Sequence, residues 1–247
     1  MAPDGRRRRP GAGGGLGSFE RGPPARALHQ CRAPLRAPGP GRRAAGVTPP
    51  GSSSPFLRRA VFLDRDGVVN RDSPAFIKSP EELEMLPGAA EAIARLERAG
   101  FVVAVVTNQS GIGRGLFTEE ALARTHARLI QEVEAAGGRI HAIRHCPHLP
   151  DAGCACRKPL PGLVEELGRD LQVDLASSFF VGDRPEDIQC GTAAGATSVL
   201  VLTGNTDRWD PERFPCAPAH VARDLPAAVE WILAQPGAPA HSPGNSP

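Results

Sequence analysis

Short apolar runs alternate with amphipathic segments along the chain from residue 60 onward. The runs are brief and rich in valine, phenylalanine and isoleucine, which is typical of buried strands. They are AVFLD at 60–64, FVVAVV at 101–106, SFFVG at 178–182 and TSVLVL at 197–202, with IHAIRHC at 140–146 as a further candidate. We therefore expect a sheet built from these segments.

The segments between the runs carry helix signals. Between 118 and 138, apolar residues recur at helical spacing behind a threonine cap and an acidic first turn. Further helices are expected at 87–100, 161–171, 185–195 and 224–234, with a short helical turn at 79–82. Because strands and helices alternate, the predicted fold class is α/β, with a doubly wound parallel sheet and helices on both of its faces.

Composition divides the chain into three parts. Residues 1–55 contain 11 glycines and 10 prolines and show no apolar periodicity, so we expect a disordered, basic arm. Residues 236–247 have a similar character, which leaves one folded domain at 56–235. The arm has no apolar run typical of a secretory signal, and a true start near Val47 stays open.

Charge is distributed unevenly. Residues 1–59 carry 12 arginines and two acidic residues, although the whole chain has a net charge of only +2. The expected domain is therefore acidic, which argues against nucleic acid as a partner of that domain. No stretch approaches the roughly 18 apolar residues of a membrane span. We expect a monomeric, cytoplasmic protein with no membrane partner.

Three of the six cysteines crowd one loop beside a histidine. The four residues are Cys146, His148, Cys154 and Cys156. Three thiols and one imidazole fill a tetrahedral Zn²⁺ shell and leave no open position, which predicts a structural zinc. A Cys154–Cys156 disulfide is disfavoured, because its ring would be small and strained and a reducing cytoplasm opposes it. Arg157 and Lys158 follow the last ligand directly.

Reactive side chains stand near the ends of the predicted strands. Asp64 and Asp183 end two of them, and open α/β sheets bind ligands at that edge. Asp64 and Asp66 are two residues apart and should point the same way in extended chain, where a hard cation such as Mg²⁺ would relieve their repulsion. Asp183 could complete this site. The alternative is a turn with capping aspartates. Asp187, four residues after Asp183, could hydrogen-bond this cluster, but for Asp187 alone we favour a simple helix-dipole role.

The segment TNQSGIGRG at 107–115 follows a strand and precedes a helix. Its small polar side chains and exposed backbone N–H groups suit a phosphate. It is not a dinucleotide fingerprint, because Leu116 stands where the last glycine would be, and the chain has no Walker A lysine. Lys158 could neutralise a phosphoryl group in transfer.

The motifs FLDRDG, VVTNQSG, CRKP and VGDRPED, in this order between residues 60 and 202, resemble those of the haloacid dehalogenase superfamily of phosphatases. The resemblance implies that superfamily's Rossmann-like fold, here without a large cap domain because the segments between motifs are short. RDSPAFIKSPEE, TNQSGIGRG and the cysteine loop look most like the heptose-bisphosphate 7-phosphatases, which serve the synthesis of nucleotide-activated heptose. The histidinol-phosphate phosphatases are the rival.

The resemblance also implies roles. Asp64 would be the nucleophile and form an aspartyl-phosphate. Asp66 would protonate the leaving oxygen and later activate water. Thr107 and Lys158 would hold the phosphoryl oxygens. Mg²⁺ would lie between Asp64, the backbone carbonyl of Asp66 and Asp183.

Contacts to a small sugar phosphate substrate are implied for a further set of residues. They are Asp72, Ser73, Pro74, Ala75, Asn108, Gln109, Ser110, Arg157 and Arg184. Arg157 is the candidate for the second phosphate of a bisphosphate. A hypothesis of another class is a zinc-stabilised binding module without catalysis, which would use the basic arm. The acidic domain and the complete set of aspartates weigh against it.

Overall fold

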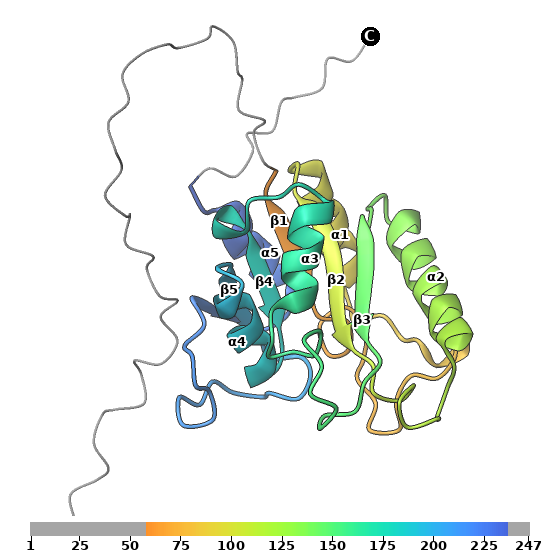
Figure 1. Cartoon of the computed structure of the whole chain (residues 1–247). Coiled ribbons are helices and arrows are strands. Elements are labelled where there is room, and N and C mark those ends of the chain that lie inside the picture. Colours follow the sequence, from red (N-terminus) through yellow and green to blue (C-terminus); the bar gives the residue numbers. More distant parts are fainter. Residues whose placement is uncertain (1–57, 237–247) are drawn as a thin grey trace, which may run out of the picture.

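The computed structural model describes residues 58–236, which form a six-stranded, all-parallel sheet flanked by helices (Figure 1). The sheet order is β3-β2-β1-β4-β5-β6. The strands are β1 (Ala60–Leu63), β2 (Val102–Asn108), β3 (Ala142–Cys146), β4 (Phe179–Gly182), β5 (Thr197–Val201) and β6 (His220–Ala222). The predicted arm and all but the first residue of the predicted tail lie outside the described residues. The predicted fold class is confirmed.

Each predicted helix is present. The α-helices within residues 58–236 are α1 (Ala89–Arg98), α2 (Glu119–Ala135), α3 (Gly162–Asp170), α4 (Pro185–Ala193) and α5 (Leu225–Leu233), with 3₁₀ turns at η2 (Pro80–Glu82) and η3 (Leu175–Ser177). Thr118 caps α2 by accepting a hydrogen bond from the backbone N–H of Ala121. Among residues 58–236, no helix combines the length and the apolar character needed to cross a membrane.

Apolar side chains cover both faces of the sheet. All four residues of β1 are fully buried, and they alternate between the faces. Val61 and Leu63 pack with α1, α2 and α5, whereas Phe62 packs with α3. Figure 1 shows α3 and α4 in front of the sheet and α1 and α5 behind it. Burial on both faces explains why the strands are continuous apolar runs rather than alternating ones.

The strand order changes direction at β1. The chain runs outward from β1 through β2 to β3 and then returns to β4, which pairs with the other side of β1. Ligands of such sheets bind where the order reverses, at the carboxyl ends of the strands. Asp64 follows β1 and Asp183 follows β4, so the fold places both at this position. In the described residues no connection forms a separate cap domain, as predicted.

Candidate active site

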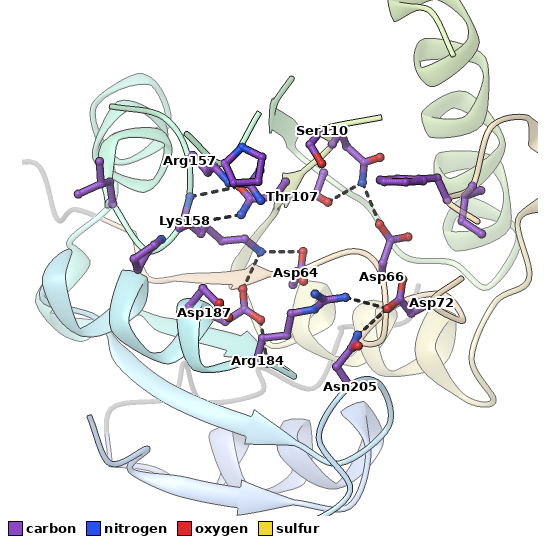
Figure 2. Close-up of a pocket in the computed structure, with 18 of the residues that line it drawn as sticks. Asp64, Asp66, Asp72, Thr107, Ser110, Arg157, Lys158, Arg184, Asp187 and Asn205 are labelled. Atoms are coloured by element: carbon purple, nitrogen blue, oxygen red, sulfur yellow. Dashed lines mark hydrogen bonds and ion pairs between the residues drawn. The ribbon is translucent and has the colours of Figure 1, made fainter. Parts of the chain in front are cut away.

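A pocket of about 730 Å³ opens at the carboxyl ends of β1, β2 and β4 (Figure 2). It gathers side chains from segments that lie far apart in the sequence. The predicted site residues that line it are Asp64, Asp66, Asp72, Ser73, Pro74, Thr107, Asn108, Gln109, Ser110, Arg157, Lys158 and Arg184. Ala75 does not line it, and Asp183 is fully buried at its base.

Lys158 lies between two buried carboxylates. Its Nζ is 2.7 Å from Oδ1 of Asp64 and 2.7 Å from Oδ1 of Asp187, and it donates to the backbone carbonyl of Val106 at 2.9 Å (Figure 2). Burial alone would lower the pKa of Lys158, but the charges of Asp187 and Asp64 outweigh it and raise that pKa above its usual value. Lys158 is therefore a firmly charged ammonium whose three hydrogens are all engaged.

Asn108 fixes the backbone that carries this lysine. Its Nδ2 donates to the carbonyl of Lys158 at 3.2 Å, and its Oδ1 accepts from the N–H of Lys158 at 3.1 Å. Because both ends of the amide are used in this way, Asn108 holds Lys158 in place. The amide has a second N–H on Nδ2 and a second lone pair on Oδ1, so the substrate contact of Asn108 stays a prediction.

Only one of the two carboxylate oxygens of Asp64 is engaged by other described residues. Its Oδ1 binds Lys158 and also accepts the N–H of Arg65 at 2.7 Å, whereas Oδ2 makes no hydrogen bond within residues 58–236. Burial raises the pKa of Asp64 to about 8 against the attraction of Lys158, and the charges of Asp187 and Asp183 add to the rise. Additional positive charge beside Asp64 would stabilise its ionised form and lower this pKa.

Asp183 has an oxygen suited to a cation. Its Oδ2 accepts the N–H of Asn205 at 2.6 Å, while its Oδ1 is buried with no hydrogen-bond partner in the described part of the chain. Burial and the charge of Asp187 raise the pKa of Asp183 to about 6. Gly67 and Gly204 leave room for this carboxylate, because a Cβ on either would come within 2.6 Å of Oδ2.

Three carboxylates could share a metal ion. One oxygen each of Asp64, Asp183 and Asp187 lies within 4.8 Å of the others. Hard oxygen donors suit Mg²⁺, and the bare Oδ1 of Asp183 supplies a donor that nothing else in the described chain occupies. The side chain of Asp66 lies outside this group, whereas those of Asp64 and Asp183, both predicted ligands, lie within it.

Asp66 is held on the other side of the pocket. Its carboxylate accepts hydrogen bonds from Arg65, Asn70 and Gln109, and Gln109 also reaches Thr107 Oγ1 at 2.9 Å. Burial alone would raise the pKa of Asp66, but the charge of Arg65 and these hydrogen bonds hold that pKa below its usual value. Asp66 is therefore ionised in the free protein.

The rim of the pocket carries a polar link across two loops. Oδ2 of Asp72 accepts from Nη2 of Arg184 at 2.8 Å and from the side-chain amide of Asn205 (Figure 2). Arg157 reaches the carbonyl of His148 at 3.4 Å and lines the same opening. Arg184 is partly neutralised by Asp72, so Arg157 is the less compensated of the two cations.

The four zinc-ligand candidates come together as predicted by their spacing. Sγ of Cys146 lies 3.5 Å from Nδ1 of His148 and 3.6 Å from Sγ of Cys154, and the His148 nitrogen lies 3.2 Å from Sγ of Cys156. Tetrahedral Zn²⁺ places such ligand atoms about 3.5–3.8 Å apart. The donor set therefore fits zinc in its chemistry, and two of the three distances match this spacing while the third is shorter. The cluster directly precedes Arg157 and Lys158 in the chain.

Two residues of the site were assigned no functional role from the sequence. Asp187 does cap α4, since its Oδ2 accepts the N–H groups of Asp183 and Arg184, but the ion pair with Lys158 was missed. The signal was its position four residues after Asp183, on the first turn of α4. Asn205 lies in a loop after β5 and carried no signal at all, because its partners come from distant segments.

The chain matches known proteins over most of its length. A model of the HAD-hydrolase-like family matches residues 155–228. The chain is 45% identical over 175 residues to the D-glycero-beta-D-manno-heptose-1,7-bisphosphate 7-phosphatase of Bordetella bronchiseptica, covering 71% of this chain and 98% of that protein. It is 48% identical over 176 residues to the Pseudomonas aeruginosa protein of the same name, again covering 71% and 98%.

A solved structure agrees with these matches. The crystal structure of D,D-heptose 1,7-bisphosphate phosphatase from Bordetella bronchiseptica, complexed with magnesium and phosphate, superposes with a TM-score of 0.65 at 45% identity. The superposition covers 71% of this chain and 98% of that one. Nearly the whole length of each relative is thus matched.

Proposed function

The chain belongs to the haloacid dehalogenase-like hydrolases, and from that premise we propose that it removes the 7-phosphate of D-glycero-D-manno-heptose 1,7-bisphosphate. The observation that carries the proposal is the contact of Lys158 with Asp64 and Asp187, beside the bare oxygen of Asp183. The choice of this sugar rests on the names of the relatives described above. The reaction would serve the synthesis of ADP- or GDP-activated heptose.

Asp64 is the nucleophile in this proposal. Its Oδ2 attacks the phosphorus of the 7-phosphate, and the bond from phosphorus to the sugar oxygen breaks, so the phosphoryl group passes to Asp64. Oδ1 is meanwhile held by Lys158 and the N–H of Arg65, which leaves Oδ2 directed at the pocket. When Asp64 becomes phosphorylated, the Lys158 hydrogen on Oδ1 can turn to a phosphoryl oxygen.

Asp66 moves the protons. In the first step it gives a proton to the departing sugar oxygen, and in the second it takes one from the water that attacks the aspartyl-phosphate, releasing inorganic phosphate. Because Asp66 is ionised in the free protein, it must gain its proton as substrate binds. Thr107 and Lys158 contact the phosphoryl oxygens, and Gln109 joins Thr107 to Asp66.

Asp64, Asp183 and the backbone carbonyl of Asp66 would hold Mg²⁺. The ion, when bound, offsets negative charge on the phosphoryl oxygens and on the buried carboxylates. The raised pKa values of Asp64 and Asp183 support this assignment, because each reports a carboxylate short of positive charge. Asp187, whose oxygens bind Lys158 and the start of α4, stays a partner of the lysine.

The second phosphate requires its own cation at the rim. We propose Arg157, which lines the opening of the pocket, for this role. Arg184 becomes available if Asp72 turns to the hydroxyl groups of the sugar. We propose that Zn²⁺ held by the cysteine loop fixes the chain that delivers Arg157 and Lys158. Its role is structural, since four protein ligands leave no position open.

A substrate panel tests the proposal. Purified protein with Mg²⁺ is assayed for phosphate release from the heptose bisphosphate, fructose 1,6-bisphosphate and histidinol phosphate. We expect the highest kcat/KM for the heptose, with loss of the 7-phosphate identified by NMR. A higher value for histidinol phosphate would reassign the substrate. No release from any of the three would favour the non-catalytic, zinc-stabilised module.

A further inference from the structure

Arg65 is a buried cation that the proposed mechanism does not use. Its side chain is fully buried, although it stands between the two proposed catalytic aspartates in sequence. The guanidinium donates from Nε to Oδ1 of Asp66 at 3.0 Å, and from Nη2 to both oxygens of Asp66 at 2.9 Å. Most of its hydrogen-bonding capacity is thus spent on a single neighbouring carboxylate.

The remaining amino group of Arg65 meets a histidine from another element. Nη1 lies 3.3 Å from Nε2 of His126, which is on the second turn of α2. A guanidinium can only donate, so Nε2 of His126 accepts and the ring carries its proton on Nδ1. Burial and the charge of Arg65 lower the pKa of His126 to about 3, in keeping with a neutral ring.

His126 is itself held by its surroundings. Its ring meets that of His145 edge to face, with centroids 5.9 Å apart, and Nε2 of His145 contacts Glu119 at the start of α2. A line of contacts therefore runs from α2 through His126 and Arg65 to Asp66. Apart from Asp66 itself, none of these residues lines the pocket.

We propose that Arg65 and His126 are positioning residues for the carboxylate of Asp66, with His126 acting only through Arg65. The inference rests on the proposed acid and base role of Asp66. Asn70 and Gln109 each donate a single hydrogen bond to Asp66, whereas the guanidinium engages both oxygens and so fixes the plane of the carboxylate. His126 fixes the plane of the guanidinium in turn.

Replacement of His126 separates positioning from packing. His126→Phe and His126→Leu fill the space of the imidazole ring but remove the acceptor of the Arg65 hydrogen bond. His126→Gln retains an acceptor near the position of Nε2. Because a well-placed general acid contributes about 10²–10⁴ in rate, we expect a misaligned one to lose about tenfold in kcat on the sugar phosphate, with KM nearly unchanged. His126→Gln should stay within about twofold of wild type.

The leaving group provides the deciding readout. Nitrophenolate leaves without needing a proton, and kcat/KM covers only the steps up to transfer of the phosphoryl group to Asp64. We therefore expect kcat/KM on 4-nitrophenyl phosphate to change by less than about twofold in His126→Phe and His126→Leu, whereas kcat/KM on the sugar phosphate falls. In an Asp66→Asn background, His126→Phe should add no further loss on the sugar phosphate. Folding of each variant is checked by urea unfolding.

Three results would each overturn the inference: equal losses of kcat/KM on both substrates, losses that add to those of Asp66→Asn, or no recovery in His126→Gln. Absence of phosphate release by the wild-type protein would instead count against the proposed function itself. The two failures are therefore distinguishable.

Discussion

Lys158 is the residue on which the charges of the pocket converge. It is 3% exposed, and it contacts two carboxylates that are themselves buried. Removing one member of such a group leaves an uncompensated buried charge, which typically costs more than the pair contributes. Substitutions at Lys158 and at Asp64 should therefore behave differently, although both belong to the same cluster.

For Asp64→Asn we expect turnover to fall by about 10⁴-fold or more, because the nucleophile is gone. Stability should change by no more than about 1 kcal/mol, since the amide keeps an acceptor for Lys158 and removes a carboxylate whose pKa is already raised by burial. Steady-state kinetics and urea unfolding at neutral pH measure the two effects. Substantial residual turnover would remove Asp64 as the nucleophile.

For Lys158→Met we expect both activity and stability to be lost, with a decrease of about 3–5 kcal/mol in the free energy of unfolding, because Asp64 and Asp187 would stay buried without their cation. Lys78→Met is a matched control, since Lys78 pairs with Glu82 at the surface and should cost at most about 1 kcal/mol. Equal effects of the two substitutions in urea unfolding would contradict this account of the cluster.

Elements with strong local patterns were predictable, and those that depend on distant partners were not. The continuous apolar runs identified β1, β2, β4 and β5 because both faces of the sheet are covered. β6 was missed, since three residues at an edge give no periodicity to detect. Sequence reasoning grouped Asp64, Thr107, Lys158 and Asp183 correctly at one edge, because strand ends converge there.

Side-chain contacts between elements that lie far apart in the sequence could not be predicted. Asn108 is one example, because its amide is engaged by the backbone of Lys158, 50 residues later, and the sequence did not predict this contact. Likewise, Asp187 lies on α4 and Lys158 in the loop before α3, and the two side chains meet only once the chain has folded. No local pattern of residues encodes such cross-element pairs.

The cysteine loop should tie stability to activity. Cys146 ends β3 next to Asn108 on β2, and Lys158 follows Cys156 by two residues, so loss of zinc would free the backbone that carries Lys158. We expect Cys156→Ser to lower zinc content, the melting temperature and kcat/KM together. Elemental analysis, thermal unfolding and kinetics measure the three.

Cys190→Ala is the control for this element. This substitution removes a buried thiol of α4 that is not one of the four zinc-ligand candidates, so zinc content should be unchanged. Fully active Cys156→Ser protein without zinc would show that the loop does not need the ion.

At the scale of the whole molecule, the acidic pocket should make stability depend on pH and Mg²⁺. Burial raises the pKa of Asp64 to about 8 and that of Asp183 to about 6, above the value of about 3.9 in an unfolded chain. The folded state then binds protons more tightly than the unfolded state, so metal-free protein loses stability as pH rises from about 4 to about 8. Bound Mg²⁺ opposes that loss.

We therefore expect the increase in melting temperature on adding Mg²⁺ to grow between about pH 5 and pH 8. Thermal unfolding of desalted protein, without chelator so that zinc is retained, measures it. Asp183→Asn should flatten the dependence. A shift of equal size at both pH values in wild-type protein would contradict the assigned carboxylates.

Because the described residues contain no cap domain, mutations that alter substrate preference and mutations that alter the chemistry fall in different parts of the molecule. Asp64, Thr107 and Asp183 stand at strand ends that the core holds fixed, whereas the rim is made by the loops that carry Asp72, Arg157 and Asn205. Mutations in those loops can alter which sugar is accepted without disturbing the apolar layers beneath. The scaffold is in this sense evolvable: exchanging the rim loops with those of a relative should transfer substrate preference while the chemistry persists.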